Sequence, residues 1–154
     1  MKIGGLIENR NLTMYRITSI RDEPGASAEI LKLFAREKIS LQYITETSIP
    51  EATATMSLCI NANEEENIDR FFNENDQIMK QIKITKIAYV SVIGIYGPHF
   101  REKPILAALF CKILGNAGIN ILGLSSSISS ISSIIASDQL HNAKNVLLKE
   151  FELP

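Results

Sequence analysis

The chain repeats its own pattern after about 80 residues, and this self-similarity limits the possible folds more than any other feature. Shifting the 154-residue sequence by 80 positions aligns Pro24 with Pro104, and the apolar positions that follow stay in register without a gap. Further along, the offset becomes 75, so that residues 56–60 (MSLCI) meet residues 131–135 (ISSII). Because such repetition reflects a repeated supersecondary unit, we expect two copies of one small fold.

Each half of the repeat is expected to follow the order strand, helix, strand, strand, helix. The opening strands are predicted at residues 14–20 and 90–95, and each runs into a loop that contains proline. The last helices are predicted at residues 65–73 and 139–151. The first helix of the second half is the clearest, because its apolar residues recur at spacings of three and four. These residues are Leu106, Leu109, Phe110, Ile113, Leu114 and Ala117.

Residues 123–135 (GLSSSISSISSII) hold seven serines among thirteen residues. A flexible linker is one interpretation, since serine-rich tracts bury little apolar surface. The four isoleucines of the segment favour the other interpretation, a β-hairpin with its turn near residues 127–129. In its second arm, residues 130–135, Ile131 would point toward the helices while serines cover the opposite face.

Each half needs one more strand to complete its sheet. The first half has a candidate at residues 81–85, whereas the second half has too few residues left after Phe151. A spare strand is expected at residues 2–7, before the turn-like residues 8–11 (ENRN). We therefore predict an α+β fold of two βαββαβ modules, with antiparallel sheets, helices on one face and the first module inserted into the second. The first module is residues 12–87, and the second is residues 1–8 plus 88–154.

Composition and charge exclude several classes of function. The residues are 45% apolar and 21% charged, as in globular domains. The net charge of -1 offers no basic surface for nucleic acid or anionic membranes. The chain shows no secretory signal and no membrane-spanning apolar run, so we expect a cytosolic protein. Cys59 and Cys111 lie within apolar runs and are expected to be small buried side chains, not disulfide partners or metal ligands. No metal or cofactor is expected.

The motifs, taken in order, resemble the paired ACT domains in the regulatory region of aspartate kinases. The resemblance covers nearly the whole chain and rests on residues 17–44 and 89–135. Within them, DEPG at residues 22–25, AGINI at 117–121 and ISSII at 131–135 match the turn, loop and strand motifs of that family. The resemblance implies ferredoxin-like modules, an amino-acid effector (lysine or threonine) and a homodimer formed through the modules. It also implies inhibition of an aspartate kinase catalytic domain or subunit.

One other interpretation of the function remains open. The chain carries no kinase domain, P-loop or nucleophile elbow, so we expect no catalysis by this chain alone. It departs from the family at Glu46 and Thr47, where a Gln-Asn pair is common, and at Ile105, which replaces the turn glycine. A ligand-free ACT module that serves only dimerisation is therefore the alternative to an amino-acid sensor. A β-branched residue resists positive φ, so the second loop is not expected to hold a ligand.

The candidate site is the turn at residues 22–27, which leads from a strand to a helix N-terminus. Backbone N–H groups and the positive end of the helix dipole favour a carboxylate there. Gly25 would let the backbone approach the ligand, and Asp22 or Glu46 would receive its ammonium group. In the alternative interpretation, Asp22 merely caps the helix. We expect Asn120 to form a second wall of this pocket. The full candidate set is Asp22, Glu23, Pro24, Gly25, Ala26, Ser27, Ser40, Leu41, Gln42, Glu46, Thr47, Ile119, Asn120 and Ile121.

Overall fold

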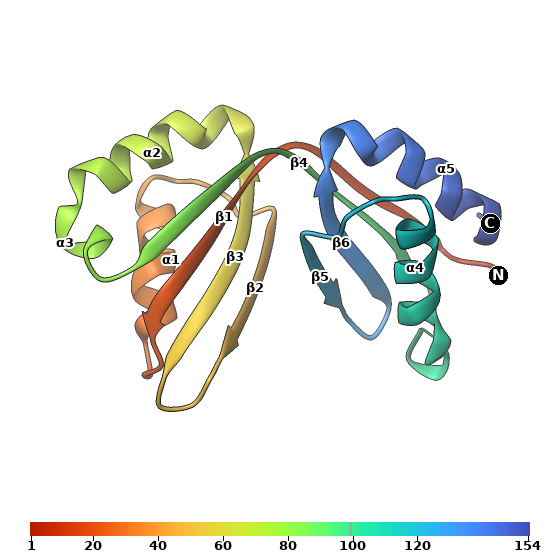
Figure 1. Cartoon of the computed structure of the whole chain (residues 1–154), viewed down its shortest axis with the longest axis horizontal. Helices are drawn as coiled ribbons and strands as arrows, with labels where there is room; N and C mark the ends of the chain where they lie inside the picture. Colours follow the sequence, from red (N-terminus) through yellow and green to blue (C-terminus); the bar gives the residue numbers. More distant parts are fainter. Residues whose placement is uncertain (99) are drawn as a thin grey trace. The chain divides into compact units, whose positions relative to one another are not determined.

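The computed structural model describes residues 1–98 and 100–154 and shows an α+β fold (Figure 1). The strands are hydrogen-bonded in the order β2-β3-β1-β4-β6-β5. The strands are β1 (Gly5–Arg21), β2 (Tyr43–Ser48), β3 (Thr53–Asn61), β4 (Lys83–Tyr96), β5 (Gly123–Ser126) and β6 (Ser130–Ala136). The helices are α1 (Ala26–Arg36), α2 (Glu65–Glu74), α3 (Asp76–Met79), α4 (Ile105–Asn116) and α5 (Leu140–Glu150). Short 3₁₀ turns lie at Ala62–Glu64, Phe100–Glu102 and Ser137–Gln139.

The described chain divides into two compact units. The first unit is residues 12–89, and the second unit combines residues 1–11 with residues 90–154. The chain therefore passes between the units within β1 and within β4. The α+β class is confirmed, whereas the description as two ferredoxin-like modules, one inserted into the other, stays a prediction.

The core of the first unit lies between its strands and the helices α1 and α2. Ile30, Leu33 and Phe34 are buried at the three- and four-residue spacing that places side chains on one helix face. Phe72 of α2 contacts both Tyr15 of β1 and Phe34 edge to face, with ring centroids 5.9 and 6.1 Å apart. These aromatic contacts join the two helices to the sheet.

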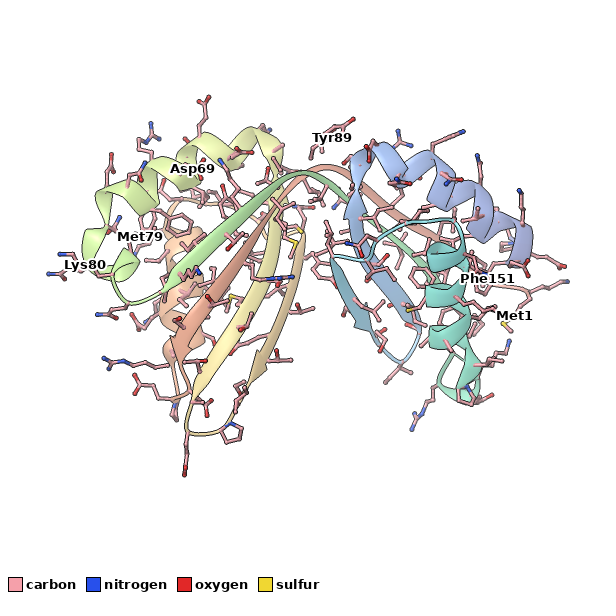
Figure 2. The ribbon with its side chains drawn as sticks, in the orientation of Figure 1. Met1, Asp69, Met79, Lys80, Tyr89 and Phe151 are labelled. Atoms are coloured by element: carbon pink, nitrogen blue, oxygen red, sulfur yellow. The ribbon has the colours of Figure 1, made fainter. Side chains whose placement is uncertain are left out.

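The second unit repeats this arrangement with α4 and α5. Its core contains Phe110 of α4, Leu147 of α5 and Phe151, which follows α5 (Figure 2). The first residues of the chain belong to this unit, because the amide of Ile3 donates to the carbonyl of Glu152 (2.9 Å). Ile3 is itself buried in this core.

Matching hydrogen bonds show that the sequence repeat is also a structural repeat. After α1, the amide of Ile39 donates to the carbonyl of Phe34 (2.9 Å). Eighty residues later, the amide of Ile119 donates to the carbonyl of Leu114 (3.0 Å). The offset of 80 derived from the sequence therefore aligns α1 with α4 residue by residue.

The serine-rich segment forms the hairpin β5–β6, so the linker interpretation is wrong. The amide of Ser127 donates to the carbonyl of Ser130 (2.8 Å) and closes the turn. Ile131 is buried among the helices, as predicted. Ser133 shares its face, is fully buried and donates to the carbonyl of Ile93 (3.4 Å), so the serines do not all cover the other face. Ile128, which is 70% exposed, lies at the turn and adds nothing to the core.

Two predicted interruptions of the strands are wrong. Residues 8–11 were expected to turn, but β1 continues through them. Residues 83–85 of the strand predicted at 81–85, and all of the strand predicted at 90–95, are likewise parts of the single strand β4. Asn11 (φ 57°) and Tyr89 (φ 58°) are left-handed residues within these strands, at the points where the chain passes between units. Asparagine tolerates this conformation, so a polar stretch bends without ending the strand.

The two cysteines are free thiols. Cys59 in β3 is fully buried, as expected, and burial raises the pKa of its thiol to about 12. Cys111 in α4 is only half-buried, because it lies at the edge of the core.

Candidate functional site

The predicted turn joins β1 to α1 and ends in a left-handed glycine. Gly25 has φ 87° immediately before α1, and the amide of Ala26 donates back to the carbonyl of Glu23 (3.2 Å). No described side chain caps α1. Because the first amides of a helix lack intrahelical acceptors, those of Ser27 and Ala28 remain available at this end. The turn thus has the geometry that favours a bound carboxylate.

Asp22 does not cap the helix, so that alternative interpretation of the residue is wrong. Its carboxylate accepts a hydrogen bond from the backbone amide of Glu51 (3.1 Å). Glu51 lies in the turn of the β2–β3 hairpin and itself has a positive φ of 61°. Asp22 therefore ties the end of β1 to the hairpin turn within the first unit.

Glu46 of β2 lies against the N-terminal turn of α1. Both of its carboxylate oxygens are 2.6 Å from the hydroxyl oxygen of Ser27, which can donate to one of them at a time. A carboxylate next to a helix N-terminus is favoured by the dipole. Glu46 consequently occupies part of the positive end of α1. An incoming carboxylate has to share this end with Glu46 or displace the Glu46 side chain.

Thr47 lies on the opposite face of β2 from Glu46. In the β2–β3 pairing, Glu46 faces Met56, a residue of the helix-covered core, whereas Thr47 faces Thr55. Successive side chains of a strand point to opposite faces. The structure therefore brings Glu46, but not Thr47, to the turn.

The loop between α1 and β2 contributes mainly to the apolar core and to hydrogen bonding with β3. Leu41 packs against the core of the first unit, and the amide of Gln42 donates to the carbonyl of Cys59 (2.8 Å). Ser40 is exposed. Among the predicted residues of this loop, only Ser40 has a side chain that is largely open to solvent.

Ile119, Asn120 and Ile121 belong to the second unit. Ile119 is buried and Ile121 packs against the same core, so both are structural residues there. Asn120 is exposed. Its role as a second wall of the candidate site stays a prediction. Ile105 begins α4 and is 61% exposed. Pro104 before it has φ -63°, so this helix does not follow a left-handed residue as α1 follows Gly25.

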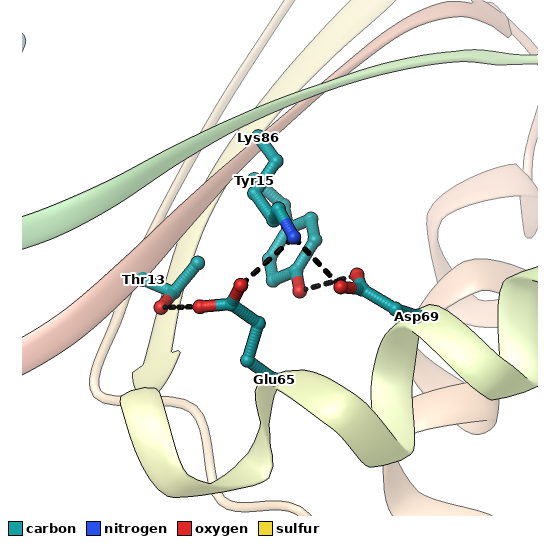
Figure 3. A network of polar contacts seen from close by, with 5 residues as sticks. All are labelled: Thr13, Tyr15, Glu65, Asp69 and Lys86. Atoms are coloured by element: carbon teal, nitrogen blue, oxygen red, sulfur yellow. Dashed lines mark hydrogen bonds and ion pairs between the residues drawn. The ribbon is translucent and has the colours of Figure 1, made fainter.

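A polar network that the sequence analysis missed ties α2 to β1 and β4 in the first unit (Figure 3). Lys86 donates to Glu65 (2.8 Å) and to Asp69 (2.7 Å), and Tyr15 donates to Asp69 (2.9 Å). Thr13 completes the network by donating to Glu65 (2.8 Å). These contacts hold α2 across two strands.

The network shifts the pKa of Glu65 and the pKa of Tyr15. Hydrogen bonds from Lys86 and Thr13 lower the pKa of Glu65. Burial and the hydrogen bond to Asp69 raise the pKa of Tyr15. Glu65 is thus charged and Tyr15 neutral at physiological pH, which is the arrangement that the hydrogen bonds require. We assign this network a structural role.

A pocket of about 300 Å³ in the first unit was also missed. It lies between the end of β1, one face of α1 and the residues before β4. Glu23 and Ala26 of the candidate set line it together with Arg21, Ile30 and Arg36. A comparison of the two halves of the repeat holds the signal that could have found it, since Ile30 aligns with the larger residue Phe110.

Two other types of site are not found among the described residues. Within residues 1–98 and 100–154, no three His, Cys, Asp or Glu side chains lie close enough together to hold a metal ion. No helix in the described part of the chain is long and apolar enough to cross a membrane.

The chain is similar in sequence and structure to aspartate kinases. No family model matches it. It is 25% identical, over 97% of its length, to an aspartokinase of Mycolicibacterium smegmatis, and it spans only 36% of that protein. Its fold matches the ligand-free regulatory subunit of aspartate kinase from Thermus thermophilus with a TM-score of 0.81 and 16% identity, covering 96% of this chain and 97% of that one.

A second solved structure has the same fold within a longer chain. This is E. coli aspartokinase III in complex with lysine and aspartate in the T-state, with a TM-score of 0.72 and 16% identity. The match covers 96% of this chain and 33% of that one. The predicted resemblance to the regulatory region of aspartate kinase is thus confirmed.

Proposed function

We propose that this chain is an amino-acid-sensing regulatory region of an aspartate kinase, and that its first unit binds the effector at the β1–α1 turn. The observation that carries the proposal is the uncapped N-terminus of α1, which follows the left-handed Gly25 and has Glu46 beside it. The fold shared with the regulatory subunit from Thermus thermophilus supports the regulatory role.

An amino acid has the two charges that this turn can recognise. Its carboxylate would accept hydrogen bonds from the amides of Ser27 and Ala28, where the dipole of α1 favours negative charge. Its ammonium would pair with Glu46 or Asp22, and charge-assisted hydrogen bonds of this kind are short and strong. Binding requires the Ser27–Glu46 contact to loosen, so the effector exchanges one hydrogen bond for several.

We propose lysine or threonine as the effector. The resemblance to aspartate kinases suggested both, and the lysine-bound T-state structure of aspartokinase III supports testing lysine first. Effector binding with dissociation constants from millimolar to micromolar would supply roughly 4 to 8 kcal/mol. Allosteric control commonly uses about 1 to 3 kcal/mol of this as coupling, so a modest affinity is sufficient to inhibit a kinase domain or subunit.

The two units are, in this proposal, the ACT modules of the regulatory region, and the second unit uses the N-terminal part of β1 as its extra strand. The modules pair with those of a second chain in a homodimer. Sedimentation at micromolar concentration should then give about twice the 17.1 kDa chain mass. A monomer with and without effector would contradict this part of the proposal.

Isothermal titration calorimetry of the chain against each of the twenty amino acids tests the sensor directly. We expect heat of binding from lysine or threonine, and a melting temperature that rises with the concentration of that amino acid. If none of the twenty binds the folded chain and the melting temperature depends only on protein concentration, the chain is a dimerisation module and not a sensor.

A further inference from the structure

The pocket beside α1 has an apolar floor. Ile20, Ile30 and Leu33 line it and are nearly fully buried, and Ile82 adds apolar surface from the residues before β4. At about 300 Å³, the pocket is at the small end of the range for sites that bind small molecules. Its floor suits an apolar ligand body.

The second unit has filled the equivalent position. With the offset of 80 residues, Ala26 corresponds to Leu106 and Ile30 corresponds to Phe110. Both of these larger side chains are fully buried in the second unit. At these two positions the first unit therefore has smaller side chains than the second unit, which leaves more room beside α1.

The charges at the rim also differ between the two units. Arg21, Lys32 and Arg36 line the pocket with two carboxylates, Glu23 and Glu29. Lys32 is paired with Glu29 (3.0 Å), whereas no ion pair is found for either arginine among the described residues.

The rim therefore carries one net positive charge on a chain whose total charge is -1. Arg36 corresponds to Asn116 in the second unit, so this cation is absent there. The first unit thus combines an open floor with a cation that the other copy lacks.

We propose that this pocket binds a small organic anion, in which an apolar body lies on the isoleucines and an acidic group pairs with Arg36, the cation that the second unit lacks. Guanidinium groups form bidentate hydrogen bonds with both carboxylates and phosphates. The pocket adjoins the turn of the proposed amino-acid sensor, because Glu23 and Ala26 belong to both. Its cation lies farther along α1, since Arg36 is ten residues beyond Ala26, or about 15 Å away along the helix. The proposal does not require that the turn bind an amino acid.

NMR titration of the whole ¹⁵N-labelled chain tests this proposal with defined probes. Benzoate and phenyl phosphate carry the two acidic groups on the same apolar ring, and benzyl alcohol is the neutral control. We expect saturable shifts at the backbone amides of the lining residues for at least one anion. Comparison of the two anions shows whether the site prefers a carboxylate or a phosphate.

Two variants reproduce the second unit within the first. Ile30→Phe fills the floor, and Arg36→Asn removes the cation. Each is expected to weaken anion binding at least fivefold, while the matched charge control Lys112→Gln, on α4 of the second unit, leaves the affinity unchanged. Circular dichroism verifies that each variant is folded, and Arg36→Asn keeps the test valid if Ile30→Phe does not fold.

Three results would overturn the proposal. These are no saturable shifts at the pocket up to about 20 mM of either anion, equal binding of benzyl alcohol, and an affinity that Arg36→Asn does not change. Failure of the amino-acid titration would leave these results unaffected, since benzoate and phenyl phosphate lack the ammonium group that the turn is proposed to recognise.

Discussion

Replacing Gly94 by alanine tests whether the serine-rich segment is a strand that pairs with β4. In the β4–β6 ladder, Gly94 lies opposite Ser132. A Cβ atom at position 94 would overlap the backbone carbonyl of Ile131 and lie 2.8 Å from the Cβ of Ser132. Both neighbours belong to the strand itself, so they can move aside only if the ladder shifts.

The expected cost of this substitution follows from that overlap. Inserting atoms into a well-packed site typically costs about 1–3 kcal/mol. Because the obstacle is backbone, we expect a cost of about 2–3 kcal/mol for Gly94→Ala. For a chain of this length, each kcal/mol lowers the melting temperature by about 2–4 °C, so Tm should fall by about 5–10 °C.

Gly115→Ala is the matched control. It is expected to raise the stability, whereas Gly94→Ala is expected to lower it. Gly115 lies in α4, and no described atom outside its own helix backbone and neighbours lies within 4 Å of the added methyl group. Alanine stabilises a helix interior by about 0.5–1 kcal/mol relative to glycine, and because Gly115 is the next-to-last residue of α4, we expect a gain at or below the lower end of this range. Thermal unfolding followed by circular dichroism measures both variants. If Gly94→Ala melts at the wild-type temperature, β4 and β6 do not pair in this register.

The polar network of the first unit supplies two further predictions. Tyr15→Phe removes the hydrogen bond to Asp69, and urea unfolding should show a loss of about 0.5–1.5 kcal/mol; an unchanged midpoint would show that this bond adds nothing. Glu65 has a lowered pKa when folded, mainly through its hydrogen bond from Lys86, so its contribution to stability is present above its unfolded pKa and is lost as the pH falls through the folded value. Unfolding from pH 6 to pH 3 should therefore depend less steeply on pH in Glu65→Gln, and identical profiles would argue against the network.

The regular elements of this fold could be predicted from local periodicity. The apolar stripe of residues 106–117 located α4 (Ile105–Asn116) closely, and the isoleucines of the serine-rich segment identified β6. The continuity of β1 could not be predicted, because residues 8–11 (ENRN) have the composition of a turn. Whether such residues turn or extend depends on strand pairing with distant segments, which composition does not report.

The local part of the candidate site could be predicted, whereas the contacts that depend on strand faces and on distant residues could not. The turn around Gly25 has the expected left-handed residue and an uncapped helix. Glu46 and Thr47 were both assigned to the site, although the side chains of successive strand residues point to opposite faces. The contact between Tyr15 and Asp69 joins residues 54 positions apart, and no local pattern indicates it.

Calorimetric titration of lysine and threonine into the wild-type chain, Gly25→Val and Ile105→Gly tests the central claim most directly. A β-branched residue at φ 87° is strained and would intrude where the ligand's carboxylate approaches, so Gly25→Val should lose binding if it folds. Ile105→Gly should leave the affinity nearly unchanged, because that loop is not part of the site. Retained binding in Gly25→Val together with lost binding in Ile105→Gly would contradict the account, since the site would then lie in the second unit.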